Sequence, residues 1–344
     1  KIAKSPETDV YALIEEDLNF AISKLPDTRY VGHAVKGSAQ GLLGRVLLTQ
    51  EKWADAAVVL KQIIDSNTFS LYGSFRNLFL TAGQNYRNGH PEIMFSTRYL
   101  APDNIHSEMN GMDVEIGLYL LLQAYGDLAD SYQMADGLPA SESPIFDDTD
   151  SITRYSNRDP RLDMTLRLPG EVWTNPSTGD TVVDDAVLYT GFVMEKYLDL
   201  SRAPFERSAT SAQSDQDLVH LRYADVLLMY AEAKNEATGP DATIYAALDE
   251  VRGRSGVGML PVNQTRYNTK ESLREYIRNE RRVELALEGH RYFDLKRWKT
   301  AQEKLDGMEL TGGATMVFRA ENYYLPFPQD EIDRNPNLKQ NDGY

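Results

Sequence analysis

Apolar residues near the start of the chain recur with the spacing of one helical face. Between Pro6 and Pro26 they fall three and four positions apart, at Val10, Leu13, Ile14, Leu18, Ala21, Ile22 and Leu25. Ser5 is a favourable N-cap, Pro6 suits the first helical position, and Pro26 cannot continue a helix. The pattern predicts a first amphipathic helix that packs one face inward.

Two further helices are predicted as a hairpin over residues 36–67. The apolar side of the first helix consists of Ala39, Leu42, Leu43, Val46 and Leu47. That of the second consists of Trp53, Ala56, Ala57, Leu60, Ile63 and Ile64. Gly37, Gly41 and Gly44 leave room for a close neighbour. The pair has about the size of a 34-residue tetratricopeptide repeat.

A second hairpin is predicted from His220 onward. The A-x-x-L-L spacing of the first hairpin returns at Ala224, Leu227 and Leu228, and small and apolar residues follow at 246–251. That spacing alone is common in leucine-rich helices, but two hairpins of similar size indicate a repeat architecture. We therefore predict a mainly α fold with a tetratricopeptide-type scaffold.

The periodicity fails between the two hairpins. A short strand is predicted at 93–99 and a small hairpin around "NPSTGD", within an otherwise irregular insertion. Long insertions on a helical scaffold often carry binding residues. The last residues, rich in proline, predict an extended segment and one helical turn laid against the body. The predicted divisions are 1–68, 69–216, 217–305 and 306–344.

Charge and composition exclude several classes of function. The formal net charge is −16, so the average surface field repels nucleic acids and anionic lipid headgroups. The chain has no cysteine, which excludes thiol catalysis, cysteine zinc sites and disulfides. No apolar run approaches the roughly 20 residues of a membrane-spanning helix. The first residue is Lys1 rather than Met, so we expect a processed or truncated product.

The most highly charged stretch lies at residues 279–299. On a helix, Glu280, Glu284 and Glu288 share a face and repel one another. Opposite charges three residues apart offset this repulsion, at Arg281–Glu284, Glu288–Arg291, Arg291–Asp294 and Asp294–Arg297. We therefore predict a structural ladder of ion pairs rather than catalysis, since a glycosidase needs two carboxylates facing each other across a cleft. Truncating a buried pair is expected to lower stability by about 3 kcal/mol.

Other chemistry is sparse, and no metal or cofactor is predicted. The five histidines lack the helical spacing of a zinc site. The acidic turn "DDTD" at 147–150 could hold calcium, but it is also typical of a solvated turn. Aromatic residues with polar neighbours remain, and such rings stack on sugars. From position and chemistry we predict ligand contacts at Tyr99, His106, Tyr155, Arg158 and Trp173.

Two stretches resemble a known family. "NERRVELALEGHRYFDLKRWK" (279–299) resembles the signature of the SusD/RagB family, and "YYLPFPQDEIDRNPNLKQNDGY" resembles that family's ending, with Asp342 at a position that is usually proline. "SNRDPRL" (156–162), "LRYADVLLMYAEAKNE" (221–236) and residues 36–64 also fit, so the resemblance runs the length of the chain. It does not carry Tyr99 or Trp173, which are predicted from position and chemistry alone.

The resemblance implies a SusD-like fold and a binding protein that is not an enzyme. Family members bind oligosaccharides, polysaccharides or peptides at the cell surface and cover a SusC-like TonB-dependent transporter. They are lipid-anchored to the outer membrane through an N-terminal cysteine, and the resemblance implies a further segment with another repeat ahead of Lys1. An acidic protein suits a neutral glycan better than an anionic one.

Two alternatives remain at this stage. One is a helical glycoside hydrolase that uses carboxylates such as Asp163 or Glu171. The other is a tetratricopeptide module that binds only proteins.

Overall fold

The computed structural model of the chain describes residues 2–84, 89–105, 123–175, 178–183, 187–188, 191–202, 215–309 and 313–344. The α-helices are α1 (Glu7–Lys24), α2 (Lys36–Thr49), α3 (Trp53–Ser66), α5 (Gly126–Asp130), α6 (Tyr223–Thr238), α7 (Ala242–Arg252), α8 (Lys270–Glu284), α9 (Arg291–Arg297), α10 (Ala301–Leu305) and α11 (Gln329–Arg334). The strands are β1 (Ile93–Thr97), β2 (Gln123–Ala124), β3 (Val172–Thr174), β4 (Thr181–Val183), β5 (Val187–Leu188), β6 (Gly191–Val193) and β7 (Leu218–Arg222). The mainly helical fold agrees with the prediction.

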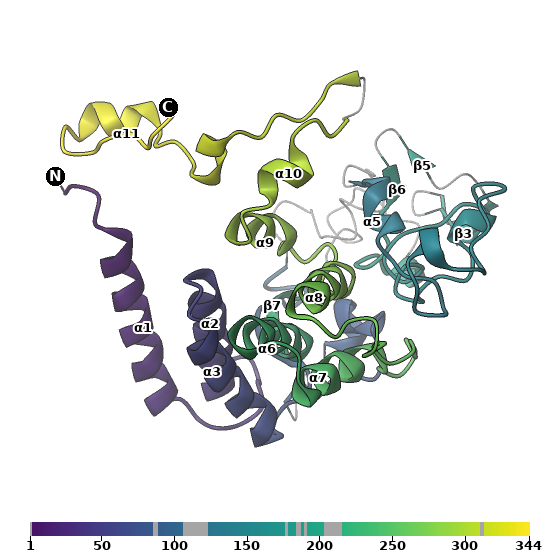
Figure 1. Cartoon of the computed structure of the whole chain (residues 1–344), viewed down its shortest axis with the longest axis horizontal. Coiled ribbons are helices and arrows are strands. Elements are labelled where there is room, and N and C mark those ends of the chain that lie inside the picture. The colour runs from purple at the N-terminus through teal and green to yellow at the C-terminus, as the bar shows by residue number, and fades with distance from the viewer. Residues whose placement is uncertain are drawn as a thin grey trace.

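The first three helices lie side by side at one edge of the molecule (Figure 1). The predicted hairpin is α2 and α3. Close packing depends on glycine, because a Cβ at Gly37 would approach the Phe69 ring within 2.5 Å and one at Gly41 would approach Leu221 within 2.6 Å. A Cβ at Gly44 would overlap Leu60. The prediction that these glycines allow close approach is confirmed.

Helix α1 has the predicted position but packs less deeply than expected. None of its residues is fully buried. Leu18 and Ile22 pack against the core, whereas Val10, Leu13 and Phe20 are exposed. The helix therefore contacts its neighbour α2 through a narrow apolar stripe.

The second hairpin, α6 and α7, lies at the centre of the molecule (Figure 1). Helix α6 is buried on nearly all sides, including five consecutive residues from Val226 to Tyr230. A helix that is apolar all round is typical of a protein core. His220, where the sequence predicted the start of this hairpin, lies instead on strand β7.

Strands β1 and β7 bring the two ends of the insertion together. They pair antiparallel, with Phe95 opposite Leu221 and Thr97 opposite Leu218. The prediction of a strand at 93–99 is confirmed for its first five residues. The insertion therefore leaves the helical scaffold and returns to it at one small sheet.

The insertion has a small core of its own. Strands β2, β6 and β5 form a three-stranded sheet, and β3 and β4 form the predicted small hairpin, in which Trp173 pairs with Val182. Tyr132, Leu162 and Phe192 pack together, and Val283 of α8 closes this core from the scaffold side. The insertion is thus packed onto the helix that carries the charged signature.

The charged stretch at 279–299 is not one helix, and this corrects the prediction of a ladder. Helix α8 ends at Glu284, and the chain turns through Leu287 (φ +65°) and Gly289 (φ +82°) before α9 begins. Glu288 therefore lies in the turn. Of the four predicted i,i+3 pairs, only Asp294–Arg297 (2.9 Å) forms within the described part of the chain.

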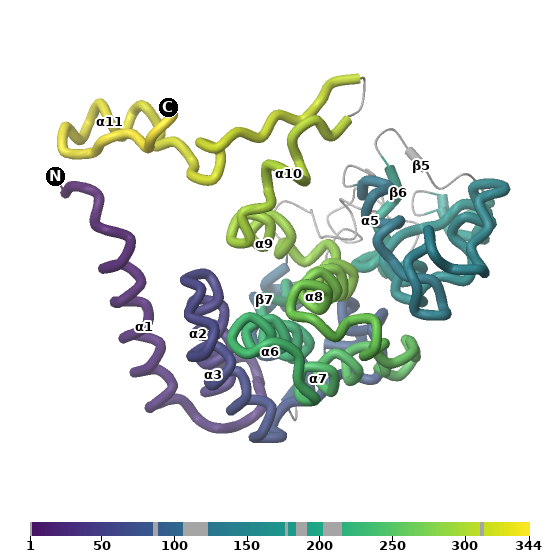
Figure 2. Tube along the Cα trace, viewed as in Figure 1, coloured from purple at the N-terminus to yellow at the C-terminus, as the bar shows by residue number. Residues whose placement is uncertain are grey.

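The C-terminal segment runs apart from the helical body and ends close to the N-terminus, as the trace in Figure 2 shows. Lys4 Nζ donates to Asn341 (2.8 Å), and Asn335 Nδ2 donates to the carbonyl of Ile2 (2.9 Å). The predicted helical turn is α11, and it has no buried residue. It lies near the first residues of the chain rather than against the scaffold.

Candidate functional site

Glu284 is the centre of a buried charge network. Its carboxylate accepts from Arg222 (2.7 Å), from Arg254 (2.7 Å) and from Arg161 (2.9 Å), and all four side chains are buried. Arg161 comes from the insertion, Arg222 from the end of β7 and Arg254 from the loop after α7. One carboxylate at the end of α8 therefore joins three separate parts of the fold.

The network extends through two further glutamates. Glu92, just before β1, accepts from Arg222 (2.9 Å) and from Arg254 (2.5 Å). Glu288 accepts from Arg222 (2.7 Å) and from Lys196 of the insertion (2.7 Å). Buried charges are tolerable only when paired and hydrogen-bonded in this way. The network is a structural element rather than a set of free acids and bases.

The pKa of Glu284 reflects both its burial and its three arginine partners. Burial alone would raise the pKa of this carboxyl, but Arg254, Arg222 and Arg161 hold it well below its usual range. Glu284 is therefore ionised at neutral pH and does not serve as a general acid. The predicted structural role of the charged stretch at 279–299 is confirmed, although its ion pairs differ from the predicted ladder.

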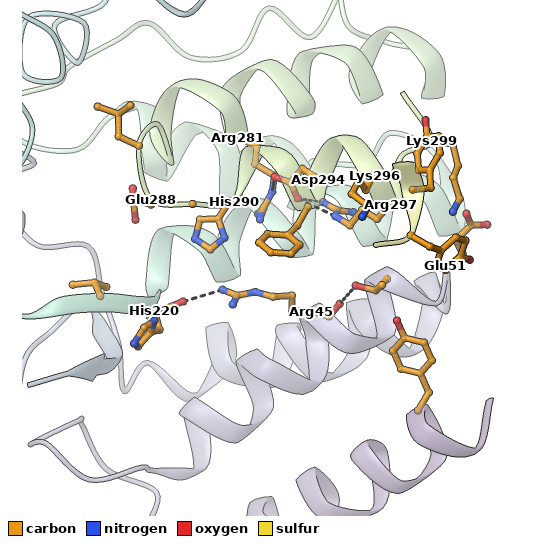
Figure 3. A pocket seen from close by; sticks show the side chains of 18 of the residues that line it. Arg45, Glu51, His220, Arg281, Glu288, His290, Asp294, Lys296, Arg297 and Lys299 are labelled. Carbon is orange, nitrogen blue, oxygen red and sulfur yellow. Dashed lines mark hydrogen bonds and ion pairs between the residues drawn. The ribbon is translucent and has the colours of Figure 1, made fainter. Parts of the chain in front are cut away.

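A second chain of ion pairs borders a cavity of about 760 Å³, which is lined by four of its members, Arg45, Arg281, Asp294 and Arg297 (Figure 3). Asp225 joins Arg45 (2.6 Å) to Arg281 (2.5 Å), and Asp294 joins Arg281 (2.7 Å) to Arg297 (2.9 Å). These pairs link α2, α6, α8 and α9. They neutralise most of the charge beside the cavity.

The walls of this cavity are aromatic and polar. His290 points from the start of α9 toward Arg45 and His220 (Figure 3). Phe293 of α9 is 68% exposed, and Tyr324 of the C-terminal segment also lines the space. Rings beside hydrogen-bonding groups suit a polar ligand with apolar faces. Local patterns in the sequence do not predict this cavity, because its residues come from segments far apart in the chain.

Of the four predicted ligand residues that the structure describes, Tyr155 and Arg158 lie together. Tyr155 is half-buried, packs edge-on against Phe192 (5.2 Å between ring centroids) and lies beside the guanidinium of Arg158 (5.9 Å). Arg158 is itself buried and donates to the carbonyl of Tyr132 (2.8 Å). Tyr99, also half-buried, follows β1, and its backbone amide donates to Asp217.

The remaining two predicted ligand residues are Trp173 and His106. Trp173 is only 6% exposed, and the guanidinium of Arg167 lies 3.8 Å from its ring centroid. A sugar could stack on this ring only after Arg167 moved away. His106 lies outside the described residues. Ligand contact therefore remains a prediction for all five positions, with Tyr99 and Tyr155 the more accessible rings.

The carboxylates suggested for a hydrolase lie too close together. Burial and, next, a hydrogen bond between the carboxyl groups of Glu171 and Asp163 raise the pKa of Glu171 to about 8. Glycosidases hold their two carboxyl groups about 5–9 Å apart, on either side of the scissile bond. Two hydrogen-bonded carboxyls do not have that geometry.

The acidic turn at 147–150 uses its carboxylates within the protein. Asp147 and Asp150 accept from backbone amides of their own turn, at Thr149 (2.9 Å) and Ile152 (2.8 Å). Asp148 pairs with Arg154 (2.7 Å). Among the described residues, no group of three or more histidine or acidic side chains is placed to hold a metal ion. Within the same part of the chain, no helix is both long and apolar enough to cross a membrane.

Comparison with known proteins identifies the family. The model of the SusD family matches residues 91–344. The chain belongs to the SusD family. Since this is a family of binding proteins, membership confirms the prediction that the chain is not an enzyme.

Individual relatives match this SusD-family protein over nearly all of its length. SusD-like protein P2 of Formosa agariphila is 30% identical over 366 residues, covering 100% of this chain and 66% of that protein. A SusD-like carbohydrate-binding protein from Bacteroides fragilis is 26% identical, with a TM-score of 0.80 over 98% of this chain and 72% of that one. A laminarin-binding SusD-like protein is 26% identical, with a TM-score of 0.65 over 99% of this chain and 70% of that one. The chain thus spans about two thirds of the length of these relatives.

Proposed function

We propose that this SusD-family protein binds a nutrient glycan, an oligosaccharide or polysaccharide, at the cell surface and passes it to a SusC-like TonB-dependent transporter. The observation that carries the proposal is family membership together with two similar solved proteins, one a carbohydrate-binding protein and one a binder of laminarin. No bond is made or broken in this function. The whole protein would be held at the outer membrane by a lipid anchor.

The structure supports the proposal through its aromatic surface. Tyr155 has Arg158 beside it and Phe192 beneath it, so the ring is held in one orientation. A fixed ring can stack on a sugar with little loss of conformational entropy. We propose the surface around Tyr155 as the glycan contact, with Tyr99 as a separate candidate contact and the cavity of Figure 3 as the competing location.

Isothermal titration against a panel of oligosaccharides tests the proposal. The panel includes β-1,3-glucan oligosaccharides, because one relative binds laminarin, and short peptides as the alternative ligand. We expect Tyr155→Ala to weaken glycan binding about tenfold, the loss of one stacking contact. Phe293→Ala is the matched aromatic control from the competing cavity. If no glycan binds the chain or its full-length form, the proposal fails.

Two further outcomes decide between the remaining alternatives. Binding of peptides without glycans would assign the protein to a different nutrient class. If Phe293→Ala abolishes glycan binding and Tyr155→Ala does not, the ligand occupies the cavity of Figure 3. Co-purification with a SusC-like transporter tests the delivery step.

A further inference from the structure

A second pocket, of about 490 Å³, lies where α8, α9 and α10 meet. Figure 1 shows these three helices following one another above the scaffold. Among the described residues that line the pocket, four are cationic and two are acidic, and the four are Arg278, Arg282, Arg291 and Lys304. The pocket is therefore cationic, in a chain whose net charge is −16.

The acidic partners of three of these cations are largely exposed, and two of these partners, Glu275 and Glu303, also line the pocket. Glu303 pairs with Lys304 (2.7 Å). Arg282 is 19% exposed and pairs with Asp127, which is 60% exposed. Arg278 is 21% exposed and pairs with Glu275, which is 70% exposed. Exposed ion pairs are weak and screened by salt. The two acidic lining residues offset two of the four cations, so the lining keeps a net excess of two positive charges.

Arg291 has no ion-pair partner within the described part of the chain. Burial and, next, the nearby charge of Arg282 lower its pKa to about 10. A half-buried cation beside other cations is costly unless an anion joins it. The position favours binding of an anionic group from outside.

The rest of the lining is partly aromatic and apolar and partly polar. The Arg278 guanidinium lies 4.8 Å from the ring centroid of Trp298, and Leu295, Asn279 and Thr300 complete the lining. The pocket is larger than a single oxyanion needs and lies in the size range of small-molecule sites. It shares Arg282, Arg291, Leu295 and Lys304 with a neighbouring, more apolar hollow of about 800 Å³. A ligand of several sugar units can extend from one into the other.

We infer that the pocket between α8, α9 and α10 binds an oxyanion substituent, a sulfate ester or a uronic carboxylate, carried by a glycan. This rests on the proposed function. Guanidinium groups pair with both oxyanions through two parallel hydrogen bonds. The average charge of the chain favours a neutral ligand, but the Debye length is about 8–10 Å, so the local cations decide binding here.

Inorganic sulfate tests the site without assuming any glycan backbone. Sodium sulfate is added at constant ionic strength against sodium chloride, and the thermal unfolding of the chain is followed. We expect sulfate to raise the midpoint of the wild type and of Arg266→Gln, an exposed arginine paired with Glu142 outside the pocket. The rise is expected to be lost in Arg291→Gln and reduced in Lys304→Gln, which changes only the exposed rim. Equal responses of all four proteins overturn the inference.

Matched glycans test whether the oxyanion is carried by a sugar. The pairs are a κ-carrageenan hexasaccharide with its desulfated form, and an oligogalacturonate with its methyl ester. We expect at least one anionic form to bind about tenfold more tightly than its neutral partner, and Arg291→Gln to abolish the difference. Binding of sulfate but of no anionic glycan overturns the inference, while binding of neutral glycans alone leaves the proposed function standing without it.

Discussion

Replacing Glu284 with glutamine is expected to lower the free energy of unfolding by about 3 kcal/mol. Removing one partner of a buried ion pair costs about 3–5 kcal/mol, because the other charge stays buried without compensation. Here each arginine keeps another partner: Arg222 and Arg254 keep Glu92, and Arg161 keeps Asp159 (2.6 Å). The effect therefore lies at the lower end of that range.

Urea unfolding at pH 7, followed by far-UV circular dichroism, measures this change. Glu275→Gln is the matched control, since Glu275 lies on the same helix, is 70% exposed and, among the residues that the structure describes, forms an ion pair only with Arg278. The control is expected to change stability by less than about 0.5 kcal/mol. Glycan affinity of the folded Glu284→Gln protein is expected to stay unchanged. A destabilisation below 1 kcal/mol, or lost binding at unchanged stability, would refute a structural role.

The same variant has a defined pH dependence. The pKa of Glu284 is depressed in the folded state, so its contribution to stability is present above the unfolded pKa and is lost as the pH falls through the folded value. The stability difference between the wild type and Glu284→Gln should therefore be full at pH 7 and shrink under strong acid. A difference that grew on acidification would contradict the assignment.

Three further predictions concern other positions. Arg291→Gln is expected to change the free energy of unfolding, measured by urea denaturation, by less than about 1 kcal/mol, because Arg291 lacks an ion-pair partner within the described chain. A loss near 3 kcal/mol would instead support the predicted ion pairs of Arg291 with Glu288 or Asp294. His90 is buried, with Nδ1 accepting from two backbone amides and Nε2 donating to the carbonyl of Gly83 (3.1 Å), and burial lowers its pKa. Its pKa in the folded state lies below the unfolded value, so the free energy of unfolding should decrease as the pH falls below about 6.5. His90→Gln should reduce this pH dependence, measured by urea unfolding between pH 5 and 7.5. Gly44→Ala should cost about 1–3 kcal/mol in thermal unfolding through overlap with Leu60, and no loss would mean that α2 and α3 separate freely.

Local patterns in the sequence predict most of the scaffold. The spacing of apolar residues, with proline or glycine near the helix ends, predicts helices α1, α2, α3 and α6, and a short apolar run predicts strand β1. These features depend on residues close together in the chain. The predicted start of the second hairpin is too early, because His220, Leu221 and Arg222 belong to strand β7, which pairs with β1. Strand pairing over such a distance leaves no local signal in the sequence.

The charged stretch shows the limit of reasoning by spacing. Spacing three and four apart implies contact only if the helix continues, and here it stops at Glu284. The glycine at position 289 was the available signal for a break. The true partners of Glu284 lie at positions 161, 222 and 254, and only the tertiary structure brings them together. For the same reason the cationic pocket around Arg291 could not be predicted.

The charge network also bears on how ligand specificity can change. Its members include Glu92 and Arg222 at the two ends of the insertion, and Arg161 and Lys196 within it. Ion pairs at these four residues therefore hold the insertion against the scaffold, and the loops between them connect fixed positions. Lengthening such a loop is inexpensive, about 0.6 kcal/mol for each doubling. The same frame can present loops of different length and chemistry, so a new ligand preference requires no redesign of the helices.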